Sequence, residues 1–249
     1  MLPEDLKVSD GSGVLLVNYF GLLDEFILEQ QKQYDMVIID CTQAFFCPPV
    51  LRKGVDNIYS CRKFIGVADG AYLIAEDSQA DQFTSEDSWP SYLALCKAHE
   101  RGTNAAYMES LENEKRFLNE RNGMSKLTKK ILRAVDYKSI KQKRRTNFAY
   151  LEQTLCERNR LKLPLNQGVP YLYPYWVREG TGPYIKAKLL EERIYIPTLW
   201  RECLDVCAPH ELEYQWTNDL VCLPIDQRYD ENDMKEIVKK VMDIERSIP

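Results

Sequence analysis

Two short apolar runs separated by an amphipathic stretch constrain the fold of this chain more than any other feature. Residues 14–21, Val-Leu-Leu-Val-Asn-Tyr-Phe-Gly, and residues 35–40, Asp-Met-Val-Ile-Ile-Asp, have the continuous apolar character of strands that are covered on both faces. Between them, residues 22–33 place leucine, phenylalanine and isoleucine among acids and glutamines, which indicates an amphipathic helix. Strand, helix and strand in this order predict a right-handed βαβ unit in a parallel sheet.

Strand-like and helix-like stretches continue to alternate along the chain. A third strand leads to Ser60, and Ser125 and Asp230 are expected to cap helices. The other expected elements are helices over about 89–117, 126–135, 139–158 and 183–193 and strands over 71–75, 171–177, 194–200 and 220–225. The sequence therefore predicts an α/β protein, with a mostly parallel sheet carrying helices on both faces in residues 1–135 and a small α+β domain in residues 136–249.

Composition excludes several classes of protein. The chain has 249 residues, of which 45% are hydrophobic and 29% charged, values that are ordinary for a globular protein. A formal net charge of −5 disfavours a general binder of nucleic acids or anionic membranes. No apolar run is long enough to cross a bilayer, and the acidic N-terminal residues lack the apolar core of a signal peptide. We therefore expect a cytoplasmic protein with no membrane partner.

The eight cysteines predict neither a disulfide framework nor a metal site. Disulfide scaffolds are typical of short secreted chains, and this chain is neither short nor visibly secreted. Cys203 and Cys207 are close in sequence, but the only histidines are His99 and His210, and no second cysteine pair completes a zinc-binding spacing. We expect free thiols and no bound metal.

Basic residues dominate positions 126–145, which leaves two interpretations of this stretch. A nucleic-acid or phosphate-binding face would need Lys141, Lys143, Arg144 and Arg145. No aromatic residues interleave with the charges, so a solvated helix surface is favoured and no nucleic-acid partner is expected.

Polar residues follow three consecutive predicted strands. Asn18, Asp40 and the Ser60/Lys63 pair each stand at a strand's carboxyl end, where ligands bind in open parallel sheets. An isolated aspartate such as Asp40 is more often a cap or a turn residue. Lys63 lies among aromatic and aliphatic neighbours between two strands, and burial that lowers a lysine pKa suits Schiff-base chemistry. Together they favour a cofactor site, with Lys63 as a pyridoxal-phosphate lysine.

Pyridoxal phosphate requires four interactions with its protein, and four residues near this edge could supply them. Lys63 would form the Schiff base, and the Asp40 carboxylate would pair with the ring nitrogen. Gln43 could hydrogen-bond the ring hydroxyl, and Ser60 could hold the phosphate.

These motifs resemble fold type I pyridoxal-phosphate aminotransferases, in particular the DegT/DnrJ/StrS-type sugar aminotransferases. The similarity rests on residues 17–21, on Ile-Ile-Asp-Cys-Thr-Gln-Ala-Phe at 38–45, on Tyr-Ser-Cys-Arg-Lys-Phe-Ile-Gly-Val-Ala-Asp-Gly-Ala-Tyr-Leu at 59–73, and on Cys-Leu-Pro-Ile-Asp at 222–226. It implies the same roles for Asp40, Gln43, Ser60 and Lys63. It also implies that residues 1–135 form part of the family's large cofactor domain and residues 136–249 its small domain.

The resemblance implies transfer of an amino group, with glutamate as donor, to a keto-sugar nucleotide in surface polysaccharide or related sugar synthesis. The cofactor of such enzymes lies at a subunit boundary, which implies a homodimer. Two features depart from the family. The Ser-x-x-Lys spacing is shorter than usual in it, and its members carry a further N-terminal portion that this sequence lacks. A fragment, a chain completed by a partner, or a shortened non-catalytic relative therefore stays open as the alternative.

Overall fold

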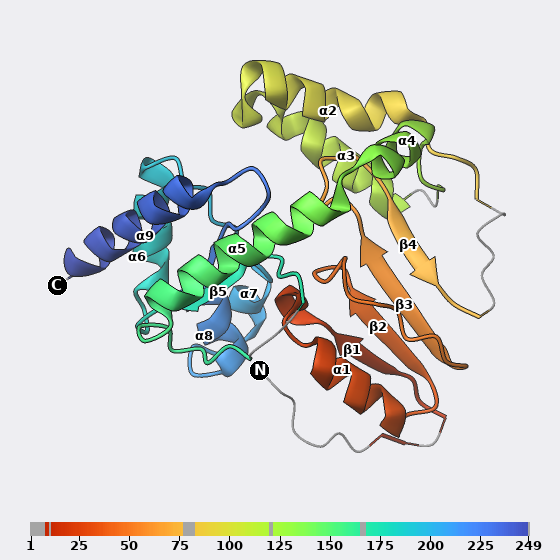
Figure 1. The fold of residues 1–249 in the computed structure, drawn as a ribbon, viewed down its shortest axis with the longest axis horizontal. Coiled ribbons are helices and arrows are strands. Elements are labelled where there is room, and N and C mark those ends of the chain that lie inside the picture. Colours follow the sequence, from red (N-terminus) through yellow and green to blue (C-terminus); the bar gives the residue numbers. More distant parts are fainter. Residues whose placement is uncertain (1–7, 10, 77–82, 120–121, 165–167, 249) are drawn as a thin grey trace. The chain divides into compact units, whose positions relative to one another are not determined.

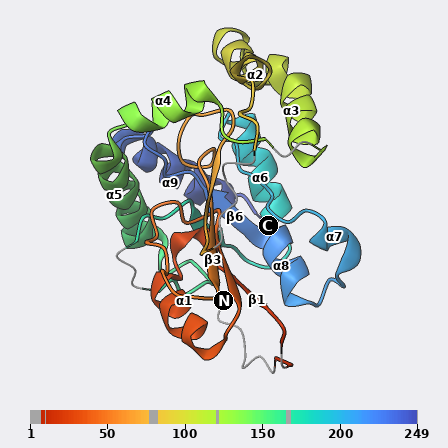
Figure 2. The ribbon, with the colours of Figure 1, turned by 90° about the vertical axis from the view of Figure 1, so that its right-hand side faces the viewer.

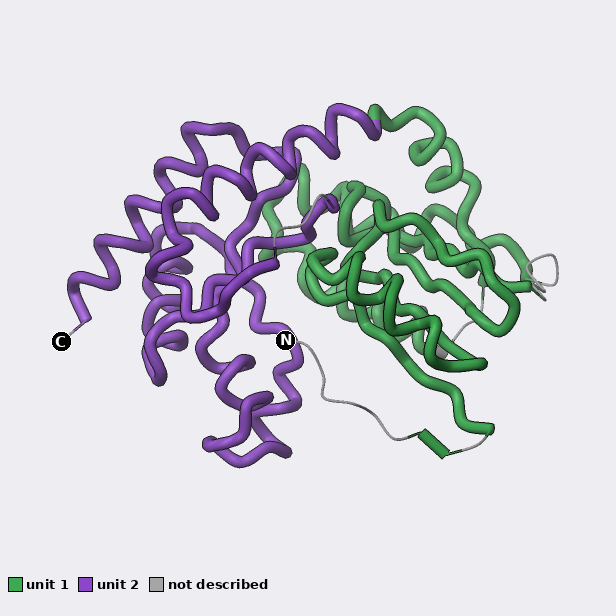
Figure 3. Tube along the Cα trace, turned by 60° about the horizontal axis from the view of Figure 1, so that its bottom comes forward, with its two compact units in different colours: residues 1–136 green, residues 137–249 purple. Residues whose placement is uncertain are grey.

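The computed structural model describes residues 8–9, 11–76, 83–119, 122–164 and 168–248 (Figure 1). The chain divides into two compact units, residues 1–136 (unit 1) and residues 137–249 (unit 2), coloured separately in Figure 3. Each unit has its own buried apolar core.

Unit 1 is built on a four-stranded sheet. Its strands are β1 (Val14–Val17), β2 (Val37–Cys41), β3 (Val55–Ser60) and β4 (Ala71–Ile74), in that order across the sheet (Figure 1). The first three strands are parallel, and β4 is antiparallel to β3. Helix α1 (Asp24–Gln30) and a 3₁₀ turn (Gln31–Gln33) connect β1 to β2, so the predicted βαβ unit is confirmed. The predicted α/β class with a mostly parallel sheet is confirmed as well.

The two faces of this sheet differ in burial. One face and α1 form the core, and Figure 2 shows α1 against that face. The buried residues of this core include Leu16, Ile27, Ile39 and Tyr59. Strand side chains alternate between faces, so the residues between these point to the opposite side.

On the opposite face, burial on both sides of the strands was the wrong expectation for part of the sheet. Leu15 is 60% exposed, Ile38 43% and Leu73 56%. An uninterrupted apolar run therefore does not by itself establish that both faces are covered. The remaining helices of unit 1 are α2 (Ser88–Arg101), α3 (Tyr107–Asn119) and α4 (Lys126–Ala134), with 3₁₀ turns at Tyr19–Gly21 and Thr103–Ala106.

Local signals explain where two helices of unit 1 begin and end. Asp87 caps α2 by accepting a hydrogen bond from the backbone of Trp89, and Gly102, with φ of +86°, ends that helix. The Ser125 side chain accepts from the Thr128 backbone at 3.2 Å, so the predicted cap of α4 is confirmed.

Unit 2 combines an antiparallel strand pair with helices, as predicted for an α+β domain. Strand β5 (Tyr173–Trp176) pairs with β6 (Leu220–Leu223). The helices are α5 (Tyr137–Leu155), α6 (Gly182–Glu191), α7 (Cys203–Val206), α8 (Leu212–Asp219) and α9 (Glu231–Arg246). Asp230 and Asp233 form a reciprocal capping box at the start of α9, which confirms the predicted cap.

The predicted strand over 194–200 is wrong. Residues 194–198 form no regular element, and Arg193 and Trp200 have φ values of +61° and +52°. The Ile194 backbone donates to the Leu189 carbonyl at 2.8 Å, and Pro197 has no N–H to give a neighbouring strand. The apolar residues resemble a strand, but their donors are used or missing.

A buried arginine in α5 shows that the basic stretch is not a solvated helix surface throughout. Arg144 is only 1% exposed and donates to Gln227 and to the carbonyls of Pro170 and Tyr171. Burial lowers the pKa of its guanidinium to about 10, against a smaller opposite effect of Asp226. Arg145 donates to the Gly168 carbonyl. Two of the four residues that a nucleic-acid face would need are therefore engaged in the fold of unit 2.

Candidate active site

The carboxyl ends of β1, β2 and β3 lie at one edge of the sheet because these strands are parallel. Asp40 is the next-to-last residue of β2, Ser60 ends β3, and Lys63 follows three residues later. The loop that carries Lys63 is closed at its base by a hydrogen bond from the Cys61 backbone to the Gly70 carbonyl at 3.1 Å.

Lys63 and Asp40 meet through Thr42. Lys63 Nζ lies 3.4 Å from Thr42 Oγ1, and the Thr42 backbone donates to Asp40 Oδ1 at 2.8 Å. Desolvation by the surrounding chain lowers the pKa of Lys63, Asp40 opposes this shift, and Arg62 adds to it. Lys63 as a whole is exposed, so its partly desolvated amine is still reachable from solution. A lysine that loses its proton more easily because it is desolvated is equipped for nucleophilic attack on a carbonyl.

Gln43 and Asn18 are used in local structure. Gln43 is 7% exposed, and its Oε1 accepts from the Phe20 backbone at 3.1 Å, which holds Phe20 at φ of +60°. Asn18 accepts from the Leu23 backbone at 3.0 Å and donates to Asp24 at 2.7 Å. Both side chains therefore fix the turn from β1 into α1, although Gln43 Nε2 donates no hydrogen bond to the described residues.

Ser60 lines a cavity that does not include Asp40 or Lys63. It lines a cavity of about 970 Å³ in unit 1, together with residues of β3, β4 and α4. Asp40 and Lys63 are not among the described residues that line this cavity. The structure thus brings Asp40, Thr42 and Lys63 together, while Ser60, at the same strand edge, lines a cavity to which Asp40 and Lys63 do not contribute.

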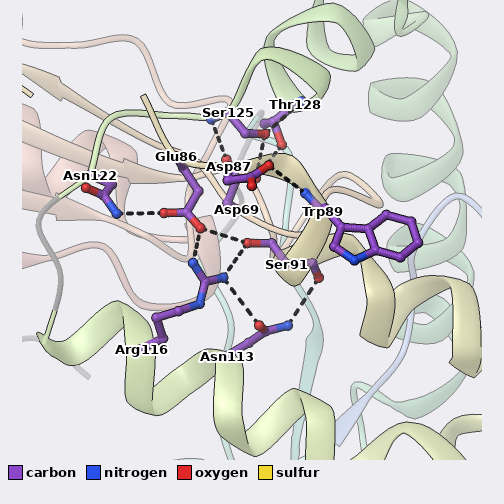
Figure 4. Close-up of polar contacts among 10 residues, drawn as sticks. All are labelled: Asp69, Glu86, Asp87, Trp89, Ser91, Asn113, Arg116, Asn122, Ser125 and Thr128. Atoms are coloured by element: carbon purple, nitrogen blue, oxygen red, sulfur yellow. Dashed lines mark hydrogen bonds and ion pairs between the residues drawn. The ribbon is translucent and has the colours of Figure 1, made fainter. Parts of the chain in front are cut away.

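Two contacts that the sequence did not indicate hold the Lys63 loop. Phe64 is buried against Phe45 and Phe46, with ring centroids 5.9 and 5.6 Å away. The buried Asp69 carboxylate accepts from the Ser125 backbone at 2.9 Å, from Ser125 Oγ at 2.7 Å and from Thr128 Oγ1 at 2.9 Å (Figure 4). The loop is therefore attached to the N-terminus of α4, where a negative charge is favourable.

A second polar cluster joins α2 and α3 to the segment before them. Glu86 is buried and contacts Arg116, Ser91 and Asn122, and Arg116 also reaches Asn113 (Figure 4). Burial raises the pKa of the Glu86 carboxyl, but the hydrogen bonds from Arg116 and Asn122 outweigh it, so its pKa lies below the ordinary value of 4.5.

This shift has a testable consequence in acid. A carboxyl whose pKa falls on folding stabilises the protein above its unfolded pKa, and the contribution is lost as the pH drops through the folded value. We expect the difference in unfolding free energy between the wild type and Glu86→Gln to be largest near neutrality and to shrink below about pH 4.5. Urea titrations at several pH values measure it. A difference that stays constant down to pH 3, or roughly so, would contradict the assigned charge effect.

Other site types find no support in the part of the chain that the structure describes. No group of three histidine, cysteine, aspartate or glutamate side chains is placed to hold a metal ion. None of the described helices combines the length and apolar character needed to cross a membrane. All eight cysteines are free thiols.

Comparison with solved structures identifies the fold. The aminotransferase TlmJ from Streptoalloteichus hindustanus matches with a TM-score of 0.57 at 14% identity, over 98% of this chain and 68% of its own. DesV of S. venezuelae, solved in complex with a ketimine intermediate, matches with a TM-score of 0.57 at 13% identity, over 97% of this chain and 67% of its own. This chain has the aminotransferase fold. A DegT DnrJ EryC1 StrS aminotransferase from Brucella abortus matches with a TM-score of 0.52 at 14% identity, over 92% of this chain and 63% of its own.

Comparison by sequence alone finds no match. No protein-family model matches the chain, and no curated protein does. The fold class expected from the resemblance is confirmed, and the solved structures that share this fold are aminotransferases. Identities of 13 to 14% establish the fold alone.

Proposed function

We propose that the protein is a pyridoxal-phosphate-dependent aminotransferase that moves an amino group from an amino-acid donor, glutamate, to a keto-sugar nucleotide in the cytoplasm. One observation carries the proposal: Lys63, with a lowered pKa, lies beside Asp40 and Thr42 at the carboxyl edge of the sheet, in a chain whose fold matches that of aminotransferases. The free state of all eight cysteines agrees with a reducing compartment.

The residues at this edge have the chemistry that the cofactor needs. Pyridoxal phosphate supplies an aldehyde and a ring that withdraws electrons. The Lys63 amine would hold the aldehyde, and its lowered pKa makes the unprotonated, nucleophilic form easier to reach. The Asp40 carboxylate would keep the ring nitrogen protonated. Thr42 contacts both side chains and would orient them.

Two further residues would complete the cradle. Gln43 Oε1 is engaged by Phe20, which fixes the side chain and leaves Nε2 to donate to the ring oxygen. Ser60 would donate its hydroxyl to the phosphate. During transfer, Lys63 would carry the proton to and from the carbon that bears the amino group. A homodimer would place the site near a second subunit.

A non-catalytic protein with the same fold is the second candidate. The exposed apolar face of the sheet at Leu15, Ile38 and Leu73 favours it, because an exposed apolar patch is typical of a surface that binds another protein. The two candidates differ in cofactor uptake.

Spectroscopic titration with pyridoxal phosphate separates them. We expect the wild type to develop a saturable visible absorbance band that Lys63→Ala lacks. Lys53→Ala is the matched control, because Lys53 is an exposed loop lysine of the same unit, and it should behave as the wild type. A wild type without a band, or a band that survives in Lys63→Ala, would contradict the proposal.

A further inference from the structure

The cavity of about 970 Å³ in unit 1 has the size of a small-molecule site. Its walls come from β3, β4, α3 and α4, all within one unit. Apolar side chains make up much of the lining and include Ile58, Leu73, Phe117 and Leu132. Leu73 is 56% exposed, so a ligand resting on this wall would remove apolar surface from water.

The acids of the lining are already satisfied. Asp69 accepts three hydrogen bonds from Ser125 and Thr128. Glu86 is neutralised by Arg116 and hydrogen-bonded by Asn122. Neither carboxylate is available to hold a cationic ligand.

The cations of the lining are not all satisfied. Arg62 pairs with Glu114 at 2.6 Å and lies over the Phe117 ring. Lys129 and Arg133 are one turn apart on α4, both exposed, and neither forms an ion pair with the described residues. The cavity therefore combines an apolar wall with two unpaired positive charges at its edge.

We propose that this cavity binds an organic anion, a molecule with an apolar, aromatic body that rests against Leu73 and Phe117 and an acidic group that faces Lys129 and Arg133. The cavity lining contains neither Asp40 nor Lys63, but it includes Ser60, which the proposed function assigns to the cofactor's phosphate; the Lys63→Ala variant therefore separates the two sites in the test. Arginine and lysine at one helix face can bind a phosphate, a sulfonate or a carboxylate group, so the apolar wall supplies the selection for the body of the ligand.

Fluorescence titration with 8-anilinonaphthalene-1-sulfonate tests the site, because this probe carries both an aromatic body and one anionic group. The double variant Lys129→Glu/Arg133→Glu should weaken saturable binding by about tenfold or more. Lys126→Glu/Lys130→Glu is the matched control, with the same charge change on the same helix outside the cavity lining, and should stay within about twofold of the wild type. Leu73→Asp should weaken binding too, and Lys63→Ala should retain it.

Several outcomes would overturn the site: no saturable binding, equal losses in the two double variants, no loss in either, or displacement of the probe by inorganic sulfate alone at comparable concentration. Circular dichroism and thermal midpoints check that the variants are folded. The neutral pair Lys129→Gln/Arg133→Gln repeats the test if charge reversal disturbs α4. Methyl NMR shifts of Met124 and Leu132 on adding the probe would locate it in this cavity, and shifts confined to other methyls would contradict that location.

Discussion

Asp69→Ala is expected to cost the protein about 3–5 kcal/mol of unfolding free energy. The buried carboxylate receives three hydrogen bonds from the first turn of α4. Removing it leaves the Ser125 backbone donor and the hydroxyls of Ser125 and Thr128 without this acceptor in a buried place. Hydrogen bonds to a charged group contribute about 1.5–3 kcal/mol each, and their losses at one site do not add in full.

Urea unfolding of Asp69→Ala and Asp69→Asn measures the loss. The asparagine variant should fall between the alanine variant and the wild type, because it keeps one acceptor and the side-chain volume. Asp35→Ala is the control: Asp35 is exposed and should change stability by no more than about 0.5 kcal/mol. Equal stability of Asp69→Ala and Asp35→Ala would show that the Asp69 contacts do not stabilise the fold.

Arg144→Met is expected to destabilise unit 2 by about 3–5 kcal/mol. The guanidinium is almost fully buried and supplies donors to Gln227 and to the carbonyls of Pro170 and Tyr171. Methionine matches much of the stem but removes the guanidinium donors that these acceptors use. Arg144→Lys should also be destabilised, because an ammonium cannot reproduce the planar fork that reaches three acceptors.

The neighbouring Lys143 provides the control. It is exposed on the same helix, and Lys143→Ala should alter the thermal midpoint little. A thermal melt in which Arg144→Met and Lys143→Ala behave alike would show that the buried guanidinium contributes nothing to the fold. Differential hydrogen exchange would report whether the loss is confined to unit 2.

Local chemistry made much of the fold predictable. The apolar runs of β1 and β2, the amphipathic α1, and the caps at Ser125 and Asp230 all depend on residues a few positions apart, and they appear as predicted. The strand over 194–200 was wrong because Pro197 and the left-handed Arg193 outweigh the apolar character of their neighbours. The exposure of Leu15 and Ile38 could not be predicted, since it depends on which elements cover the second face of the sheet.

The site was predictable only in part for the same physical reason. Parallel strands bring Asp40 and Lys63 to one edge, and strand order alone suffices to expect this. Asp69 and Arg144 were missed because their partners lie far away in sequence, and neither has a local pattern that marks it as buried. The contact of Gln43 with Phe20 likewise depends on how the β1–α1 turn folds back over β2.

Chemical trapping of the cofactor tests the central claim most directly. Protein mixed with pyridoxal phosphate is reduced with borohydride, digested, and mapped by mass spectrometry. We expect the added mass on the peptide that contains Lys63, at about one label per chain. At limiting cofactor, the Asp40→Ala variant should lose this label. An unlabelled Lys63, or a label shared evenly with exposed lysines such as Lys53, would contradict the assignment of Lys63 as the cofactor lysine.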